Sequence, residues 1–162
     1  MKRRLALLII IGVALTPCAA ASAQTTSCEP VSGKFNEFIL PKAAAPTDPY
    51  GRILGNMDGT LAGATTAFLT SLAPTATGLR VTSYNSFATV SGNQLFTIGA
   101  ADWVGIKTGF YQVNLTLTIV AGTGKYAGAG GTIIATGIGN NIGPGTGQFL
   151  YEYRGEVCTP NR

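Results

Sequence analysis

YQVNLTLTIVAGTGKYAGAGGTIIAT, residues 111–136, is the stretch of sequence that decides the fold. Apolar and polar residues alternate over residues 111–120, which is the period of a β-strand with one buried face. Five glycines follow between Gly122 and Gly131, and a second run of β-forming residues begins at Thr132. Glycine tolerates positive φ and close backbone approach. The stretch therefore predicts two antiparallel strands joined by a sharp glycine-rich corner.

The same pattern of short apolar runs and turns covers most of the chain, and no helical periodicity is seen beyond the N-terminal segment. Asp58-Gly59 is typical of a hairpin turn, and residues 140–147 (NNIGPGTG) are expected to form a loop. Residues 102–106 are either a strand or a turn around Trp103. The remaining strands are expected at residues 31–39, 60–72, 79–90, 94–98 and 148–157. About eight short strands predict an all-β domain, either an antiparallel barrel or a sandwich.

The first residues are typical of a secretion signal. Residues 2–4 are basic, residues 5–15 are apolar, and Ala21-Ser22-Ala23 fits the cleavage pattern. We expect a signal peptide over residues 1–23, one barrel domain over residues 24–162, and a secreted or periplasmic location in a bacterium. The mature chain then has eight basic and seven acidic residues, a net charge of +1. This balance argues against nucleic-acid binding, and we expect no membrane association of the mature form.

Two cysteines remain after removal of the signal, Cys28 and Cys158. An even count in an exported chain favours a disulfide, which would close a loop of about 130 residues. Chain-entropy estimates give a stabilisation on the order of 4–5 kcal/mol for such a loop. The bridge would also bring the two chain ends side by side, as a closed barrel requires. The sequence has no histidine and no CxxC motif, which argues against a metal or catalytic cysteine.

Gly122-Thr-Gly-Lys-Tyr-Ala127 formally fits a dinucleotide-binding pattern, but a helix would have to follow it. Three more glycines follow instead, and no acid lies about twenty residues further on. We therefore expect no cofactor and no metal.

Residues 117–131, LTIVAGTGKYAGAGG, resemble a segment of the allene oxide cyclase-like and dirigent-like barrels. Tyr126 stands at the aromatic position of that segment, and Ala121 replaces its usual first glycine. The end of the closing strand, Tyr153-x-Gly155, also fits. The resemblance implies an eight-stranded closed barrel and a homo-oligomer, since related barrels are often dimers or trimers. Its structural turn would be formed by Gly122, Gly124, Gly128 and Gly131.

Glu37 is the candidate for a catalytic group. The plant enzymes that the chain resembles carry a glutamate on the first strand, but the local sequence FNEFIL matches neither family, so no role is carried over. Independently of the resemblance, Glu37 shares a face of the expected first strand with Phe35 and Ile39, and an acidic residue on an apolar face is unusual. Four aromatic residues can either line a ligand cavity or fill a core: Tyr84, Trp103, Tyr151 and Tyr153.

Three functions remain open at this point. The first is a binding module that holds one small apolar ligand inside the barrel. The second is an isomerase or cyclase that confines a reactive small molecule, with Glu37 or a tyrosine steering charge. The third is a structural or surface-interaction protein without a ligand. Whether the interior is hollow, and how polar its lining is, separates these hypotheses.

Overall fold

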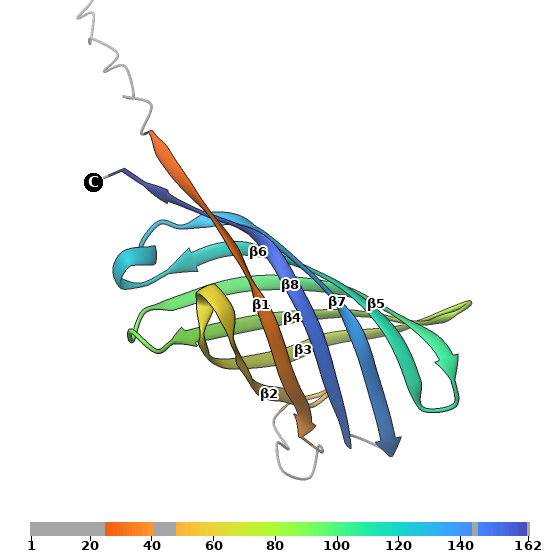
Figure 1. Ribbon diagram of the computed structural model, residues 1–162. Coiled ribbons are helices and arrows are strands. Elements are labelled where there is room, and N and C mark those ends of the chain that lie inside the picture. Colours follow the sequence, from red (N-terminus) through yellow and green to blue (C-terminus); the bar gives the residue numbers. More distant parts are fainter. Residues whose placement is uncertain (1–24, 41–47, 144–145, 162) are drawn as a thin grey trace, which may run out of the picture.

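The computed structural model describes residues 25–40, 48–143 and 146–161, and the expected signal peptide lies outside them. Eight antiparallel strands close into one barrel, in which each strand pairs with its neighbours in sequence and β1 pairs with β8 (Figure 1). The described residues contain no helix that is long and apolar enough to cross a membrane. The strands are β1 (Thr26–Leu40), β2 (Arg52–Met57), β3 (Gly63–Thr75), β4 (Gly78–Thr89), β5 (Gln94–Lys107), β6 (Phe110–Gly122), β7 (Gly130–Gly143) and β8 (Thr146–Pro160).

The predicted all-β barrel of about eight strands is confirmed, but several strands are longer than the sequence indicates. β5 is one strand where a strand over residues 94–98 and a separate strand or turn over residues 102–106 were expected, because Gly99 and Ala101 continue the hydrogen-bonded register opposite Leu117 and Leu115. β7 and β8 likewise extend into the expected loop at residues 140–147, where Asn140 pairs with Gln148. From sequence alone, small residues suggest that a strand ends. In the structure, the neighbouring strands on both sides keep these residues in the sheet.

Side-chain alternation divides every strand between an inner and an outer face. The single buried face predicted for residues 111–120 is confirmed on β6, since Val113 and Leu117 are buried, and Phe149 is buried in the same way on β8. Shifting a strand by one residue would exchange its faces, so the buried side chains fix the register. The inner faces together form the apolar core, which includes Val31, Phe35, Ile53, Met57, Leu69, Val81, Phe87, Leu95, Trp103, Ile133 and Val157.

The two ends of the barrel differ. At one end, which we call the plugged end, the connections β2–β3, β4–β5 and β6–β7 come together, as the left side of Figure 1 shows. Val90 N–H donates to the carbonyl of Ala62, and Lys125 N–H donates to the side chain of Asn93, which ties these connections to one another. At the other end, which we call the mouth, lie the β3–β4 and β5–β6 turns.

The plug itself is the short 3-10 turn η2 (Gly59–Leu61), whose Leu61 side chain is 1% exposed. The hydroxyl of Tyr153 donates to the carbonyl of Asp58 at 2.7 Å and accepts from the N–H of Leu61 at 3.1 Å. Gly59 has a φ of +79°, and a Cβ there would collide with the backbone of β1. Asp58 and Gly59 therefore reverse the chain, as predicted, and also lead into the turn η2, which packs tightly at the plugged end.

The glycine-rich corner between β6 and β7 contains a second 3-10 turn, η3 (Gly124–Tyr126). Gly124, Gly128 and Gly131 have φ values of +56°, +74° and +120°, which side-chain-bearing residues rarely adopt. Gly122 has no positive φ, but a Cβ there would lie 2.5 Å from the carbonyl oxygen of Tyr126. The positive φ values and the close approach of backbone atoms thus explain why this corner is rich in glycine, as expected from the sequence.

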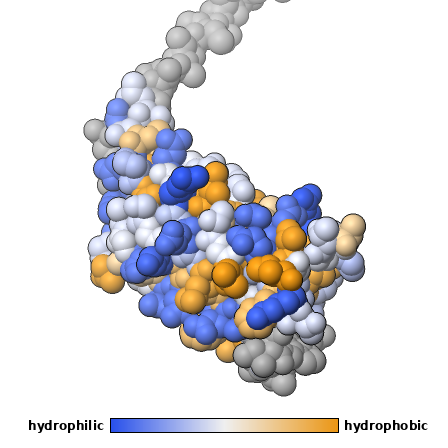
Figure 2. Space-filling model, turned by 45° about the vertical axis from the view of Figure 1, so that its right-hand side comes forward, coloured by the Kyte–Doolittle hydropathy of each residue, from blue (hydrophilic) through white to orange (hydrophobic). Residues whose placement is uncertain are grey.

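The outer surface carries many large apolar side chains. Phe38 is paired with Leu54 across β1 and β2, and Tyr84 lies between Phe68 on β3 and Ile98 on β5. All five side chains are exposed. Figure 2 shows such apolar side chains gathered into patches among polar ones on one face of the molecule.

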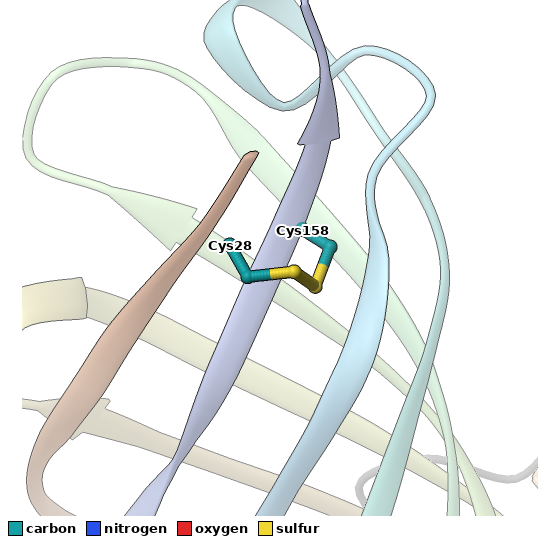
Figure 3. The surroundings of a disulfide bond; sticks show 2 residues. All are labelled: Cys28 and Cys158. Carbon is teal, nitrogen blue, oxygen red and sulfur yellow. A yellow bond between two sulfur atoms is a disulfide. The ribbon is translucent and has the colours of Figure 1, made fainter. Parts of the chain in front are cut away.

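Cys28 and Cys158 are directly opposite each other on β1 and β8 and form a disulfide, as predicted (Figure 3). Their Cα atoms lie 3.9 Å apart. The bond ties the end of the last strand to the start of the first, so it reinforces the seam at which the barrel closes. A structural disulfide fits an extracellular or periplasmic environment.

Candidate binding site in the barrel interior

The barrel interior contains a partly open cavity of about 30 Å³ between its centre and the mouth. Stacked rings of Phe35 and Phe87, with centroids 5.6 Å apart, form its floor on the side of the plug. Trp103 and Val81 border it on the side of the mouth. One water molecule needs roughly 10–15 Å³ measured in this way. The interior is therefore mostly filled by side chains, with space left for about two or three groups the size of a water molecule.

Glu37 is the charged residue that lines this cavity. It lies on β1 between the inward positions of Phe35 and Ile39, and its side chain is only 6% exposed. Gly55 on β2 is its cross-strand partner, and a Cβ at Gly55 would lie 2.8 Å from Cα and Cγ of Glu37. The missing side chain at Gly55 thus provides the space in which the glutamate packs.

The hydroxyl of Thr65 on β3 donates a hydrogen bond to Oε1 of Glu37 at 2.9 Å. Burial raises the pKa of Glu37 from 4.5 to about 7, and the Thr65 hydrogen bond opposes part of this increase. Tyr151 lines the same cavity from β8, and burial, followed by the nearby Glu37 charge, raises its pKa well above 10. Glu37 therefore changes its protonation state near neutral pH, whereas Tyr151 keeps its proton.

A second polar group lies across the cavity on β4. The hydroxyl of Ser83 donates to Oδ1 of Asn85 at 3.0 Å, and Nδ2 of Asn85 donates to the hydroxyl of Thr97 on β5 at 3.0 Å. Gly99 makes room for both side chains, since a Cβ there would meet Ser83 and Asn85. The sequence analysis missed this group. The available signal was parity, because Ser83 and Asn85 alternate with outward residues and are flanked on the same face by Val81 and Phe87.

The four aromatic candidates occupy three different environments. Trp103 and Tyr151 line the cavity. Tyr153 is buried nearer the plugged end, where its hydroxyl holds η2 in place. Tyr84 does not line the interior, because Ser83 and Asn85 on either side of it point inward and its own side chain is 59% exposed on the outer face. Trp103 also packs against Phe149, with ring centroids 4.8 Å apart.

No family model matches the sequence, and no curated protein matches it at a significant level. Among solved structures, the chain is similar to a pterocarpan synthase dirigent protein at 14% sequence identity, with a TM-score of 0.37. The match covers 91% of this chain and 96% of that chain. This likeness concerns the course of the backbone alone, and nothing about activity is taken from it.

Proposed function

We propose that this protein is an exported binding module that holds one small, mainly apolar molecule inside its barrel, beside Glu37. The observation that carries the proposal is a buried carboxyl group in a cavity of the barrel interior whose other walls are mostly apolar and aromatic. A buried ionisable group is costly to maintain, so its presence in a cavity is a mark of a functional site. Drug-sized ligands need about 300–1,000 Å³. A cavity of about 30 Å³ restricts the ligand to a few heavy atoms unless side chains at the mouth move.

Binding can be followed without a label, because Trp103 is the sole tryptophan of the chain and lines the cavity. We expect members of a panel of small alcohols, ketones, amines and terpenoid fragments to change Trp103 fluorescence and to raise the melting temperature together. Native mass spectrometry should show a stoichiometry of one. If no member of the panel gives any of the three responses, the binding proposal is wrong.

A second candidate function is an isomerase or cyclase in which Glu37 transfers a proton within a confined substrate. The observation that favours it is the pKa of Glu37 near 7, which suits a group that acts as both acid and base at neutral pH. The required test uses reactive small molecules and chromatographic separation of isomers. Glu37→Gln should keep binding but lose conversion, and equal conversion by the two proteins would rule this function out.

The third hypothesis, surface interaction, rests on the outer apolar side chains. We propose that, if the chain forms a homo-oligomer, the exposed row Phe68, Tyr84 and Ile98 takes part in the contact. Sedimentation velocity should then give a mass above that of one chain, and Tyr84→Lys should lower it. A monomer at all accessible concentrations would remove this alternative.

Export can be tested directly by expressing the full chain in a bacterium. We expect the mature protein in the periplasm or medium, with Gln24 as its first residue.

A further inference from the structure

We infer that the interior site selects a small primary amine in its ammonium form over a neutral or anionic molecule of the same size. This inference rests on the proposed binding function and names the chemical class of its ligand. It is carried by the charge, the hydrogen bonding and the aromatic walls of the cavity.

The first argument is charge. Among the described residues, Glu37 supplies the cavity's charged group, and no lysine or arginine lines it. The ion pairs found in this part of the chain lie elsewhere: Arg52 with Asp48 at the start of β2, and Arg80 with Asp102 across β4 and β5. An anionic ligand would place two like charges together in a poorly solvated space. A cation would neutralise the carboxylate and repay part of its desolvation cost.

The second argument is hydrogen bonding. Oε1 of Glu37 accepts a hydrogen bond from the Thr65 hydroxyl, so the carboxyl group already acts as an acceptor in the cavity. An ammonium group has three donors and no acceptor, so it can donate to the same carboxylate. Hydrogen bonds between charged partners are roughly twice as strong as neutral ones. On the opposite wall, the Ser83 hydroxyl donates to Asn85 and keeps its oxygen as an acceptor for a further donor.

The third argument is the aromatic lining of the cavity. The rings of Phe35, Trp103 and Tyr151 border the same cavity as Glu37. Aromatic faces attract cations, and the attraction grows when the cation is removed from water. A carboxylate that shares a cavity with aromatic rings thus favours an alkylammonium ion, whose charged end meets Glu37 while its short chain contacts the apolar side chains. The volume of about 30 Å³ limits that chain to a few carbon atoms.

The test compares three probes of one length: propylammonium, propanol and propionate. Trp103 fluorescence and thermal shift measure each affinity on the whole mature protein. We expect propylammonium to bind about tenfold or more tightly than propanol, and propionate not to bind. Equal or tighter binding of propanol would overturn the inference while leaving the binding function intact. If none of the probes binds, the inference is wrong, and the wider ligand panel decides separately whether the proposed function survives.

Two variants locate the effect. Glu37→Gln should weaken propylammonium binding about tenfold or more and leave propanol binding nearly unchanged. Glu152→Gln is the matched control, because it removes the same charge from an exposed position on β8. Circular dichroism checks that both variants fold. An equal loss of propylammonium affinity in both variants would show a general effect of charge and would contradict binding beside Glu37.

The pH dependence provides a readout that does not need a variant to fold. A primary amine stays protonated between about pH 6 and about pH 8, and so does Tyr151, the other titratable group on the cavity. The affinity of the native protein for propylammonium should therefore rise over this range as Glu37 ionises, and the affinity for propanol should not. A flat propylammonium profile would contradict the inference.

Discussion

At the scale of single residues, Glu37 shows how a fold can hold a group in an unusual state. Its carboxyl group is buried with one hydroxyl donor, so its neutral form is favoured at pH values at which an exposed glutamate is charged. The outward neighbours on the same strand, Asn36 and Phe38, have no such constraint. A shift of one residue along the strand therefore decides whether a glutamate side chain is solvated at the surface or buried in the cavity.

The pKa of Glu37 predicts a pH dependence of stability. A folded-state pKa of about 7 lies above the unfolded value of 4.5, so the folded chain binds the proton more tightly. The contribution of Glu37 to the free energy of unfolding should be largest below about pH 4.5, fall as the pH rises towards 7, and level off above it, by about 3 kcal/mol in all. Urea unfolding of the native protein and Glu37→Gln across this range isolates the effect. Parallel profiles for the two proteins would contradict it.

Tyr153 gives a second prediction at this scale. Tyr153→Phe removes the hydroxyl that joins Asp58 and Leu61 at the plug, leaving a buried N–H and carbonyl without this partner. We expect a loss of about 1–3 kcal/mol in unfolding free energy. Tyr84→Phe is the control, because Tyr84 is exposed and should change stability by less than about 0.5 kcal/mol. Similar losses of unfolding free energy from both substitutions would contradict a stabilising role of the Tyr153 hydroxyl at η2.

At the scale of elements, the sequence predicted what depends on local pattern and missed what depends on neighbours. Alternation in residues 111–120 and the glycines after Gly122 were sufficient for two strands and their corner. β5 was divided in two, because Gly99 weakens a strand pattern and only its pairing with β4 and β6 keeps it in the sheet. The Ser83 and Asn85 group was missed although the alternation along β4 places both on the face of Val81 and Phe87, because small polar residues on that face do not by themselves predict burial.

The plug turn can be tested with two glycines that have the same φ of +79°, Gly59 and Gly92. A Cβ at Gly59 would collide with the carbonyl of Ser32 and with Gly33, whereas a Cβ at Gly92 meets nothing within 4 Å. Gly92→Ala should therefore cost about 1 kcal/mol from backbone strain alone, and Gly59→Ala clearly more. Equal losses in chemical denaturation would mean that η2 is not packed against β1.

At the scale of the whole molecule, the barrel is plugged at one end, nearly filled inside, and closed along the β1–β8 seam. The first and last strands meet at this seam, where Cys28 on β1 is joined to Cys158 on β8. The two cysteines predicted this seam correctly, because a disulfide between Cys28 and Cys158 brings the first and last strands together. How much of the interior is filled could not be predicted, because it depends on the fit of side chains from all eight strands.

The disulfide predicts a measurable stabilisation of the whole barrel. Intact-mass analysis without reductant should find the mature chain two hydrogens lighter than its reduced form. Replacing both cysteines by serine should lower the free energy of unfolding by about 4 kcal/mol, because the open chain gains entropy when unfolded. The variant should still fold, since β1 and β8 remain hydrogen-bonded along the seam. Free thiols at both positions in the exported protein would contradict this account.

The central claim is that Glu37 is buried in the barrel interior rather than exposed at the surface. The most direct measurement is an NMR titration of the side-chain carboxyl carbon of Glu37, assigned by its loss in Glu37→Gln. We predict a midpoint of about 7. A midpoint near 4.5, the ordinary value for a solvated glutamate, would contradict the buried site and with it the functions that depend on it.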